Sequence, residues 1–87
     1  MKAKEMFEKL GYERVENNVN YISYKYEFSD GSYIYSTIRF YLPQQEIEFY
    51  YNDDILNSIE VEELQAINKQ VEELGWLDER WNKRNIR

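Results

Sequence analysis

The first ten residues carry apolar side chains at intervals of three and four, as on one face of an amphipathic helix. These side chains are Ala3, Met6, Phe7 and Leu10. We predict a helix over residues 2–10 that ends at Gly11, because glycine readily takes the positive φ found just after many helices.

Four segments that follow alternate apolar and polar residues, which is typical of strands with one buried and one exposed face. We expect these strands at about residues 12–16, 20–28, 32–42 and 45–51. Short connections between the last three predict an antiparallel meander. Its apolar face would carry Ile22, Tyr24, Tyr26, Ile34, Ile38, Phe40, Ile47 and Phe49.

The pairing of these strands is predicted from the requirement that apolar residues share a face. A three-residue loop at residues 29–31 pairs Tyr26 with Ile34, whereas a two-residue loop would mix the two faces. The turn Pro43-Gln44, between the strands at 32–42 and 45–51, pairs Phe40 with Ile47, which again keeps apolar residues together.

A second amphipathic helix is predicted at about residues 59–74, with Ser58 as its N-cap and Gly75 just after its end. Its apolar stripe consists of Leu64, Ile67, Val71 and Leu74. Residues 78–87 would form a short basic helix or tail. The expected fold class is α+β, a single domain over residues 1–87. In it a meander of three or four antiparallel strands has one face covered by the N-terminal and C-terminal helices.

Composition narrows the range of functions. The 87 residues carry a net charge of −6 and include neither cysteine nor histidine, which excludes thiol or imidazole catalysis, a zinc site and a disulfide framework. No Gly-rich phosphate loop occurs among the three glycines, and so short a chain leaves little room for an active-site cleft. We expect no enzyme activity, cofactor or metal. No apolar run approaches the ~20 residues that cross a bilayer, so we expect a cytoplasmic protein without a membrane partner.

The polar face of the predicted sheet is the first candidate binding surface, because it is rich in tyrosine. The residues are Tyr21, Tyr33, Tyr35, Tyr41 and Tyr50, with Lys25, Arg39, Glu46 and Glu48 among them. Tyrosine is enriched at protein interfaces, where its rigid apolar ring carries a polar tip. The alternative is intramolecular, since Lys25 over Tyr35 and Arg39 against Glu48 would be ordinary cross-strand pairs.

Charge is distributed unevenly, and the acidic part is a second candidate surface. Residues 1–40 are neutral, residues 41–79 carry −10 and residues 80–87 carry +4. The acidic residues singled out on the second helix are Glu62, Glu63, Glu72 and Glu73. They could attract a basic partner or imitate the phosphates of a nucleic acid, although a solvated helix face is the simpler interpretation.

The basic end of the chain combines tryptophan with cations, a pattern that can bind single-stranded nucleic acid. Its residues are Arg80, Trp81, Lys83, Arg84 and Arg87. We favour docking of Trp76 and Trp81 on the core instead, because the acidic remainder of the chain would repel a phosphate backbone. Nucleic acid is therefore not the expected partner.

Two segments, Lys4–Tyr12 and Glu62–Leu77, resemble small uncharacterised proteins encoded by phages and prophages of low-GC Gram-positive bacteria. The resemblance brings no functional residues, but it implies a setting in which small acidic accessory proteins bind a host protein, including defence nucleases. We therefore expect a non-enzymatic accessory protein that binds an unidentified host protein. The acidic charge of the chain would suit a nucleic-acid-handling or defence enzyme as this host protein, and the binding would inhibit that enzyme. The alternatives are a nucleic-acid-binding module that uses the basic tail and a homodimer joined through the tyrosines.

Overall fold

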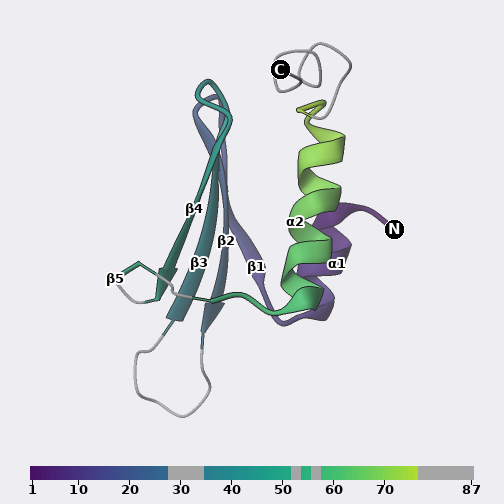
Figure 1. The fold of residues 1–87 in the computed structure, drawn as a ribbon, viewed down its shortest axis with the longest axis vertical. Coiled ribbons are helices and arrows are strands. Elements are labelled where there is room, and N and C mark those ends of the chain that lie inside the picture. The colour runs from purple at the N-terminus through teal and green to yellow at the C-terminus, as the bar shows by residue number, and fades with distance from the viewer. Residues whose placement is uncertain (28–34, 52–53, 56–57, 77–87) are drawn as a thin grey trace, which may run out of the picture.

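The computed structural model describes residues 1–27, 35–51, 54–55 and 58–76, and has two helices on one face of an antiparallel sheet (Figure 1). The elements are α1 (Ala3–Lys9), β1 (Glu13–Asn17), β2 (Tyr21–Glu27), β3 (Tyr35–Tyr41), β4 (Glu46–Tyr51), β5 (Asp54–Ile55) and α2 (Val61–Glu73). Each strand pairs with the next one along the chain, in the order β1-β2-β3-β4-β5. The predicted α+β class, an antiparallel meander with an N-terminal and a C-terminal helix on one face, is confirmed. The short strand β5 is an addition that the pattern does not predict.

The end of α1 has the backbone arrangement predicted from the position of Gly11, whose φ is 95°. The N–H of Gly11 donates to the carbonyl of Glu8 at 3.0 Å, and the N–H of the next residue, Tyr12, donates to the carbonyl of Phe7 at 2.9 Å. These two hydrogen bonds define a Schellman motif. The turn brings the ring of Tyr12 edge-on to Phe7, with centroids 5.7 Å apart, so the end of the helix also directs the chain across the core.

The end of α2 repeats this arrangement. Gly75 has a φ of 77°, and its N–H donates to the carbonyl of Glu72 at 3.1 Å. The N–H of Trp76 donates to the carbonyl of Val71, also at 3.1 Å. Trp76 is buried and its ring packs on Phe40, with centroids 6.4 Å apart. The predicted docking of Trp76 is confirmed.

The start of α2 differs from the prediction. The helix begins at Val61 with Glu60 as its N-cap, so the assignment of Ser58 as cap is wrong. The shift places Glu63 at the third helical position, where its carboxylate accepts the backbone N–H of Glu60 at 2.7 Å. An acidic side chain at this position satisfies a backbone donor that has no partner within the helix. A start at residue 59 would have placed Val61 there, which cannot accept a hydrogen bond.

The pairing of β2 with β3 is displaced by two residues from the prediction. Tyr26 lies opposite Ser36 instead of Ile34, so the predicted pairing is wrong, and the predicted loop at residues 29–31 lies outside the described residues. A displacement of two residues leaves every side chain on its predicted face, which is why the apolar pattern does not distinguish the two registers. The next pairing is as predicted, with Phe40 opposite Ile47.

The core lies between the inner face of the sheet and the helices. Phe7 of α1 stacks on Tyr24 with ring centroids 4.0 Å apart, and Phe40 meets Phe7 edge-on at 6.2 Å. Most of the predicted inner face is buried or half-buried: Ile22, Tyr24, Tyr26, Ile38, Phe40, Ile47 and Phe49. The predicted member Ile34 lies outside the described residues.

One residue of the predicted helix stripe is not in the core. Leu64 is 44% exposed, whereas Ala66, Ile67, Gln70 and Val71 are buried. The helix is rotated so that Ala66 and Gln70 face inward, which moves Leu64 to the edge. A polar residue becomes part of the buried stripe because Gln70 has a hydrogen-bond partner there, the hydroxyl of a buried tyrosine.

Candidate protein-binding face

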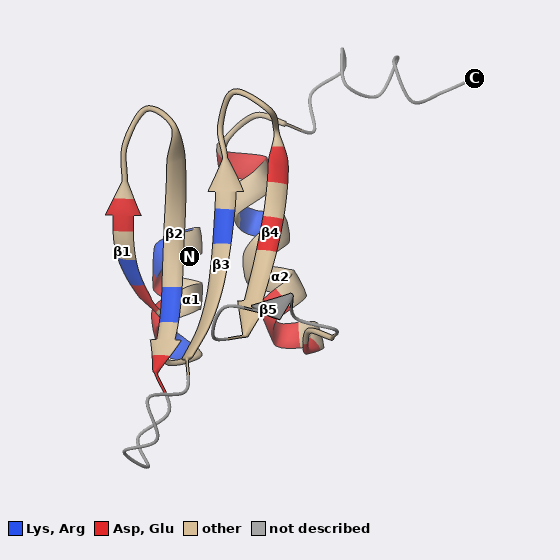
Figure 2. Ribbon diagram, turned by 90° about the vertical axis from the view of Figure 1, so that its left-hand side faces the viewer, with Lys and Arg blue, Asp and Glu red and all other residues tan. Residues whose placement is uncertain are grey.

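No described helix covers the outer face of the sheet, which is turned toward the viewer in Figure 2. The strand registers place four of the predicted tyrosines on it, each half-buried, and these form with Lys25 and Arg39 what we call the tyrosine face. The four are Tyr21, Tyr35, Tyr41 and Tyr50. The fifth candidate, Tyr33, lies outside the described residues.

Arg39, in the middle strand β3, is the centre of the tyrosine face. Its guanidinium lies 4.8 Å from the ring centroid of Tyr21, 5.9 Å from that of Tyr50 and 6.0 Å from that of Tyr41. These distances are within the range of cation–π attraction. The rings of Tyr21 and Tyr41 also meet edge-on, with centroids 6.1 Å apart. One cation from β3 thus holds tyrosines of three neighbouring strands.

Hydrogen bonds fix the Arg39 side chain in this position. Its Nε donates to the hydroxyl of Ser23 at 2.8 Å, and Ser23 is completely buried beneath it. Its terminal nitrogens lie 3.4 Å from the Tyr41 hydroxyl and from the Glu16 carboxylate. The hydrogen bond with Tyr41 raises the pKa of Arg39, so the guanidinium stays charged. The register of β1 with β2 shifts between Arg14 and Glu16, and this shift places Glu16 opposite Ser23, on the same face as Arg39.

Carboxylates hold the tyrosine hydroxyls at the edges of the face. Tyr21 donates to Glu16 at 2.8 Å, and Tyr50 donates to Glu48 at 2.7 Å. Hydrogen bonds from Tyr41 and Tyr50 lower the pKa of Glu48, because they stabilise its charged form. The hydrogen bond to Glu48 in turn raises the pKa of Tyr50, so the phenol keeps its proton. The rings and their polar tips are therefore positioned before any partner arrives.

The intramolecular contacts expected for this face are present. The ammonium group of Lys25 lies 4.6 Å from the ring centroid of Tyr35, and it also pairs with Glu27 at 3.3 Å. Arg39 lies opposite Glu48 across the strand pair. These contacts do not exclude a role in binding, because they hold the rings at the surface without removing them from it. The buried hydroxyl of Ser23, on which Arg39 depends, is a member of the site that the sequence pattern does not reveal.

The face carries more negative than positive charge. By strand register its charged residues are Glu13, Glu16, Glu27, Glu46, Glu48, Lys25 and Arg39, a net charge of −3. Glu16 and Glu48 accept hydrogen bonds from tyrosine hydroxyls, and the other three carboxylates lie toward the ends of the strands (Figure 2). A positively charged surface would therefore be attracted to it.

The four glutamates predicted on α2 do not act as one group. Glu62 and Glu72 are exposed. Glu63 accepts the hydroxyl hydrogen bond of Tyr12, and Glu73 accepts the backbone N–H of Ala3 at 2.7 Å, at the start of α1. The helix packs on the inner side of the sheet, so these residues do not adjoin the tyrosine face (Figure 1).

The residues of the alternative nucleic-acid site lie outside the described residues. They are Arg80, Trp81, Lys83, Arg84 and Arg87. The neighbouring Trp76 is buried, so its ring is not free to stack on a base. Within the described part of the chain, no helix has the length and apolar character needed to cross a membrane. The same part brings together no group of three carboxylates suited to a metal ion.

No protein-family model, curated protein or solved structure matches this chain.

Proposed function

We propose that this is a non-enzymatic accessory protein that acts by binding another protein through the tyrosine face, and that its partner presents a positively charged surface. The observation that carries the proposal is the cluster of three tyrosines around Arg39 on a sheet face that no described helix covers. A cluster serving only stability would more often lie in the core, where aromatic burial contributes most.

The arrangement of the rings favours association. Binding normally costs free energy because side chains lose rotamer freedom when they enter an interface. Here Tyr21, Tyr41 and Tyr50 are already held by Arg39 and by carboxylates, so little of that freedom remains to be lost. Tyrosine and arginine are also among the residues enriched at the energetic centres of interfaces.

The charge of the face defines the chemistry of the partner. A net charge of −3 around the rings, within a chain of net charge −6, favours a basic surface and speeds its association. Enzymes that handle nucleic acids carry such surfaces. A bacterial nuclease or another nucleic-acid-binding protein of the host cytoplasm, blocked by an acidic phage-type protein, is the partner class that we propose.

The experiment compares capture of partners by the wild type with capture by two variants. Tyr50→Ala alters the tyrosine face, and Glu62→Gln removes one charge from the exposed side of α2 as the control. Proteins captured from a Gram-positive bacterial lysate by the wild type and by Glu62→Gln, but not by Tyr50→Ala, are then purified. Each is tested for direct binding at rising salt concentration.

Support requires a binary complex that Tyr50→Ala weakens at least tenfold and that salt weakens, because exposed charges are screened. Equal binding by Tyr50→Ala and the wild type would overturn the proposal. Sedimentation analysis of the protein alone provides the second check. Concentration-dependent dimers that Tyr50→Ala abolishes would replace the proposal with the homodimer alternative, and oligonucleotide binding at ~150 mM salt would favour the nucleic-acid module.

A further inference from the structure

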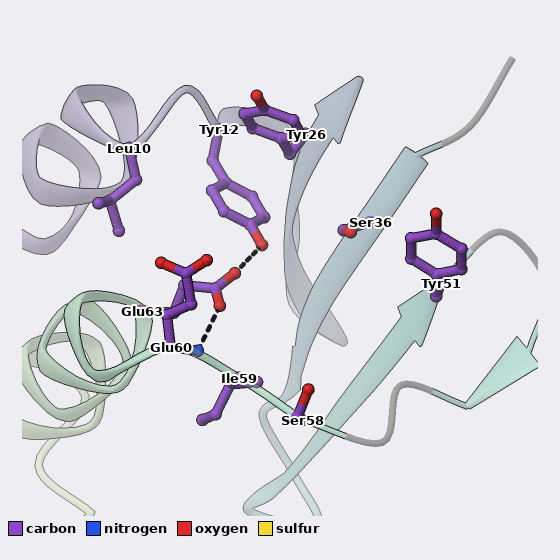
Figure 3. A pocket seen from close by; sticks show the side chains of 9 residues that line it. All are labelled: Leu10, Tyr12, Tyr26, Ser36, Tyr51, Ser58, Ile59, Glu60 and Glu63. Carbon is purple, nitrogen blue, oxygen red and sulfur yellow. Dashed lines mark hydrogen bonds between the residues drawn. The ribbon is translucent and has the colours of Figure 1, made fainter. Parts of the chain in front are cut away.

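A pocket of about 370 Å³ lies on the other side of the sheet, where the end of α1 and the start of α2 meet the strands (Figure 3). Its walls include Tyr12, Tyr26, Tyr51, Glu60 and Glu63. This volume is within the range of pockets that bind small ligands. The pocket shares no residue with the tyrosine face, so its role is independent of the function proposed above.

Aromatic rings form two sides of this pocket. The rings of Tyr12 and Tyr26 lie 5.6 Å apart and are tilted by 55° to one another. Tyr51, from β4, lies across the pocket from Tyr12 (Figure 3). Tyrosine rings carry partial negative charge on their faces and attract cations, which is how aromatic cages hold ammonium groups.

Carboxylates line the side next to α2. Glu63 is held between two donors, the hydroxyl of Tyr12 and the backbone N–H of Glu60 at 2.7 Å (Figure 3). Glu60 itself is exposed at the pocket. The start of α2 contributes roughly half a positive charge, which two carboxylates outweigh. The pocket is therefore negative overall.

The proton in the Tyr12–Glu63 hydrogen bond stays on the phenol. Burial, and then the hydrogen bond to Glu63, raise the pKa of Tyr12. The hydrogen bonds from Tyr12 and from the backbone of Glu60 fix the position of the Glu63 carboxylate. A fixed carboxylate beside aromatic rings is complementary to a small organic cation and would repel an anion.

We propose that this pocket binds an alkylammonium group, with the charged nitrogen between the carboxylates of Glu60 and Glu63 and the alkyl stem against the tyrosine rings. The group can come from a free amine, such as a polyamine, or from a lysine side chain. Both sources present the same chemistry to the pocket.

The test is a titration of the isotope-labelled full chain, followed by amide chemical shifts in NMR. The probe is n-butylammonium, and 1-butanol is the control, because it has the same alkyl stem without the charge. Near pH 7 and at about 20 mM ionic strength, where screening is weak, we expect a Kd on the order of 1–10 mM for the amine, as suits so small a ligand. The shifts should centre on residues 12, 26, 51 and 60–63.

Two variants and a matched control locate the binding. Glu60→Gln should weaken binding of the amine about fivefold, the size of one exposed charge pair. Tyr51→Leu should weaken it about two- to fivefold by removing a ring. Glu72→Gln removes the same charge from the far end of α2 and should change the Kd by less than about twofold, because the attraction between two charges about 18 Å apart in water is only a few tenths of a kcal/mol.

Spermidine and Nα-acetyl-lysine amide then distinguish the sources. Stronger binding of spermidine identifies a free polyamine, and stronger binding of the lysine derivative identifies a side chain of a partner protein. Either identification also requires that Glu60→Gln weakens binding of the ligand concerned. Equal binding of 1-butanol and n-butylammonium, no saturable shift for the amine, or equal losses in Glu60→Gln and Glu72→Gln would overturn the proposal.

Discussion

The hydroxyl of Tyr24 donates a hydrogen bond to the side-chain oxygen of Gln70 at 2.5 Å, and both side chains are buried between the sheet and α2. Each residue therefore supplies the partner that makes burial of the other tolerable. An unpaired polar group in this position would lose its contact with water and gain nothing in exchange.

Removing both partners of this pair should destabilise the fold by less than the two single removals added together. We expect Gln70→Leu and Tyr24→Phe each to lower the free energy of unfolding by about 1–3 kcal/mol, because a buried polar group is left unpaired. The double variant should lose less than the sum of the two single losses. Urea unfolding of the four proteins measures the difference. Strictly additive losses would show that the hydrogen bond does not couple the residues.

The two glycines at the helix ends should respond differently to the same substitution. Both have positive φ, so replacement by alanine should cost about 1–2 kcal/mol at either site. A Cβ on Gly11 would also lie 2.6 Å from a ring carbon of Tyr26, whereas a Cβ on Gly75 meets nothing within 4 Å. Gly11→Ala should therefore lose about 1–3 kcal/mol more than Gly75→Ala. Similar melting temperatures for the two variants would contradict this close approach.

Stability should fall at alkaline pH through Tyr12. Burial and the hydrogen bond to Glu63 raise its pKa in the folded protein above the ordinary value of about 10. A folded-state pKa above the unfolded value gives stability that is complete below about pH 10 and lost as the pH rises beyond it. The free energy of unfolding should therefore decrease above pH 10, and less steeply in Tyr12→Phe. Parallel decreases in the two proteins would assign the loss to other tyrosines.

Arg39 should not be replaceable by lysine, although both are cations. Lysine has no Nε–H in a planar group, so Arg39→Lys should lose the hydrogen bond to the buried Ser23 hydroxyl, at a cost of about 0.5–1.5 kcal/mol. The near-ultraviolet circular dichroism of the clustered tyrosines should also weaken. Lys25→Arg is the control, because it keeps a cation over Tyr35 and should change stability by no more than about 0.5 kcal/mol.

Periodicity was sufficient to predict both helices, the four longer strands and the faces of those strands. Alternation placed Tyr21, Tyr35, Tyr41 and Tyr50 on one side because every register allowed by burial preserves that side. The helix ends were also predictable, since Gly11 and Gly75 each stand one residue beyond an apolar stripe. These features depend on local spacing, which the sequence displays directly.

Features that depend on distant partners were not predictable in this way. The observed register of β2 and β3 is displaced by two residues from the predicted one. Alternation does not distinguish the two registers, because its period is two residues. Gln70 resembles a solvent-facing residue until the hydroxyl of Tyr24 is placed beside it. The pocket likewise needs Tyr12 and Glu63, which are 51 positions apart in the chain. No spacing rule connects such residues, because only the packing of α2 on the sheet brings them together.

The order of the strands also bears on how the chain acquires its structure. Each strand pairs with its predecessor, so the sheet forms from contacts that are short in sequence, whereas the hydrogen bond from Ala3 to Glu73 spans 70 positions. Closing so long a loop carries the greater entropy cost, and docking of α2 is therefore expected to follow assembly of the meander. A ribosome releases α2 after the five strands of the sheet. Until residues 61–73 emerge, α1 is the only described helix that can cover the aromatic inner face of the nascent sheet. A chain stalled at that length would therefore bind chaperones and be prone to aggregate.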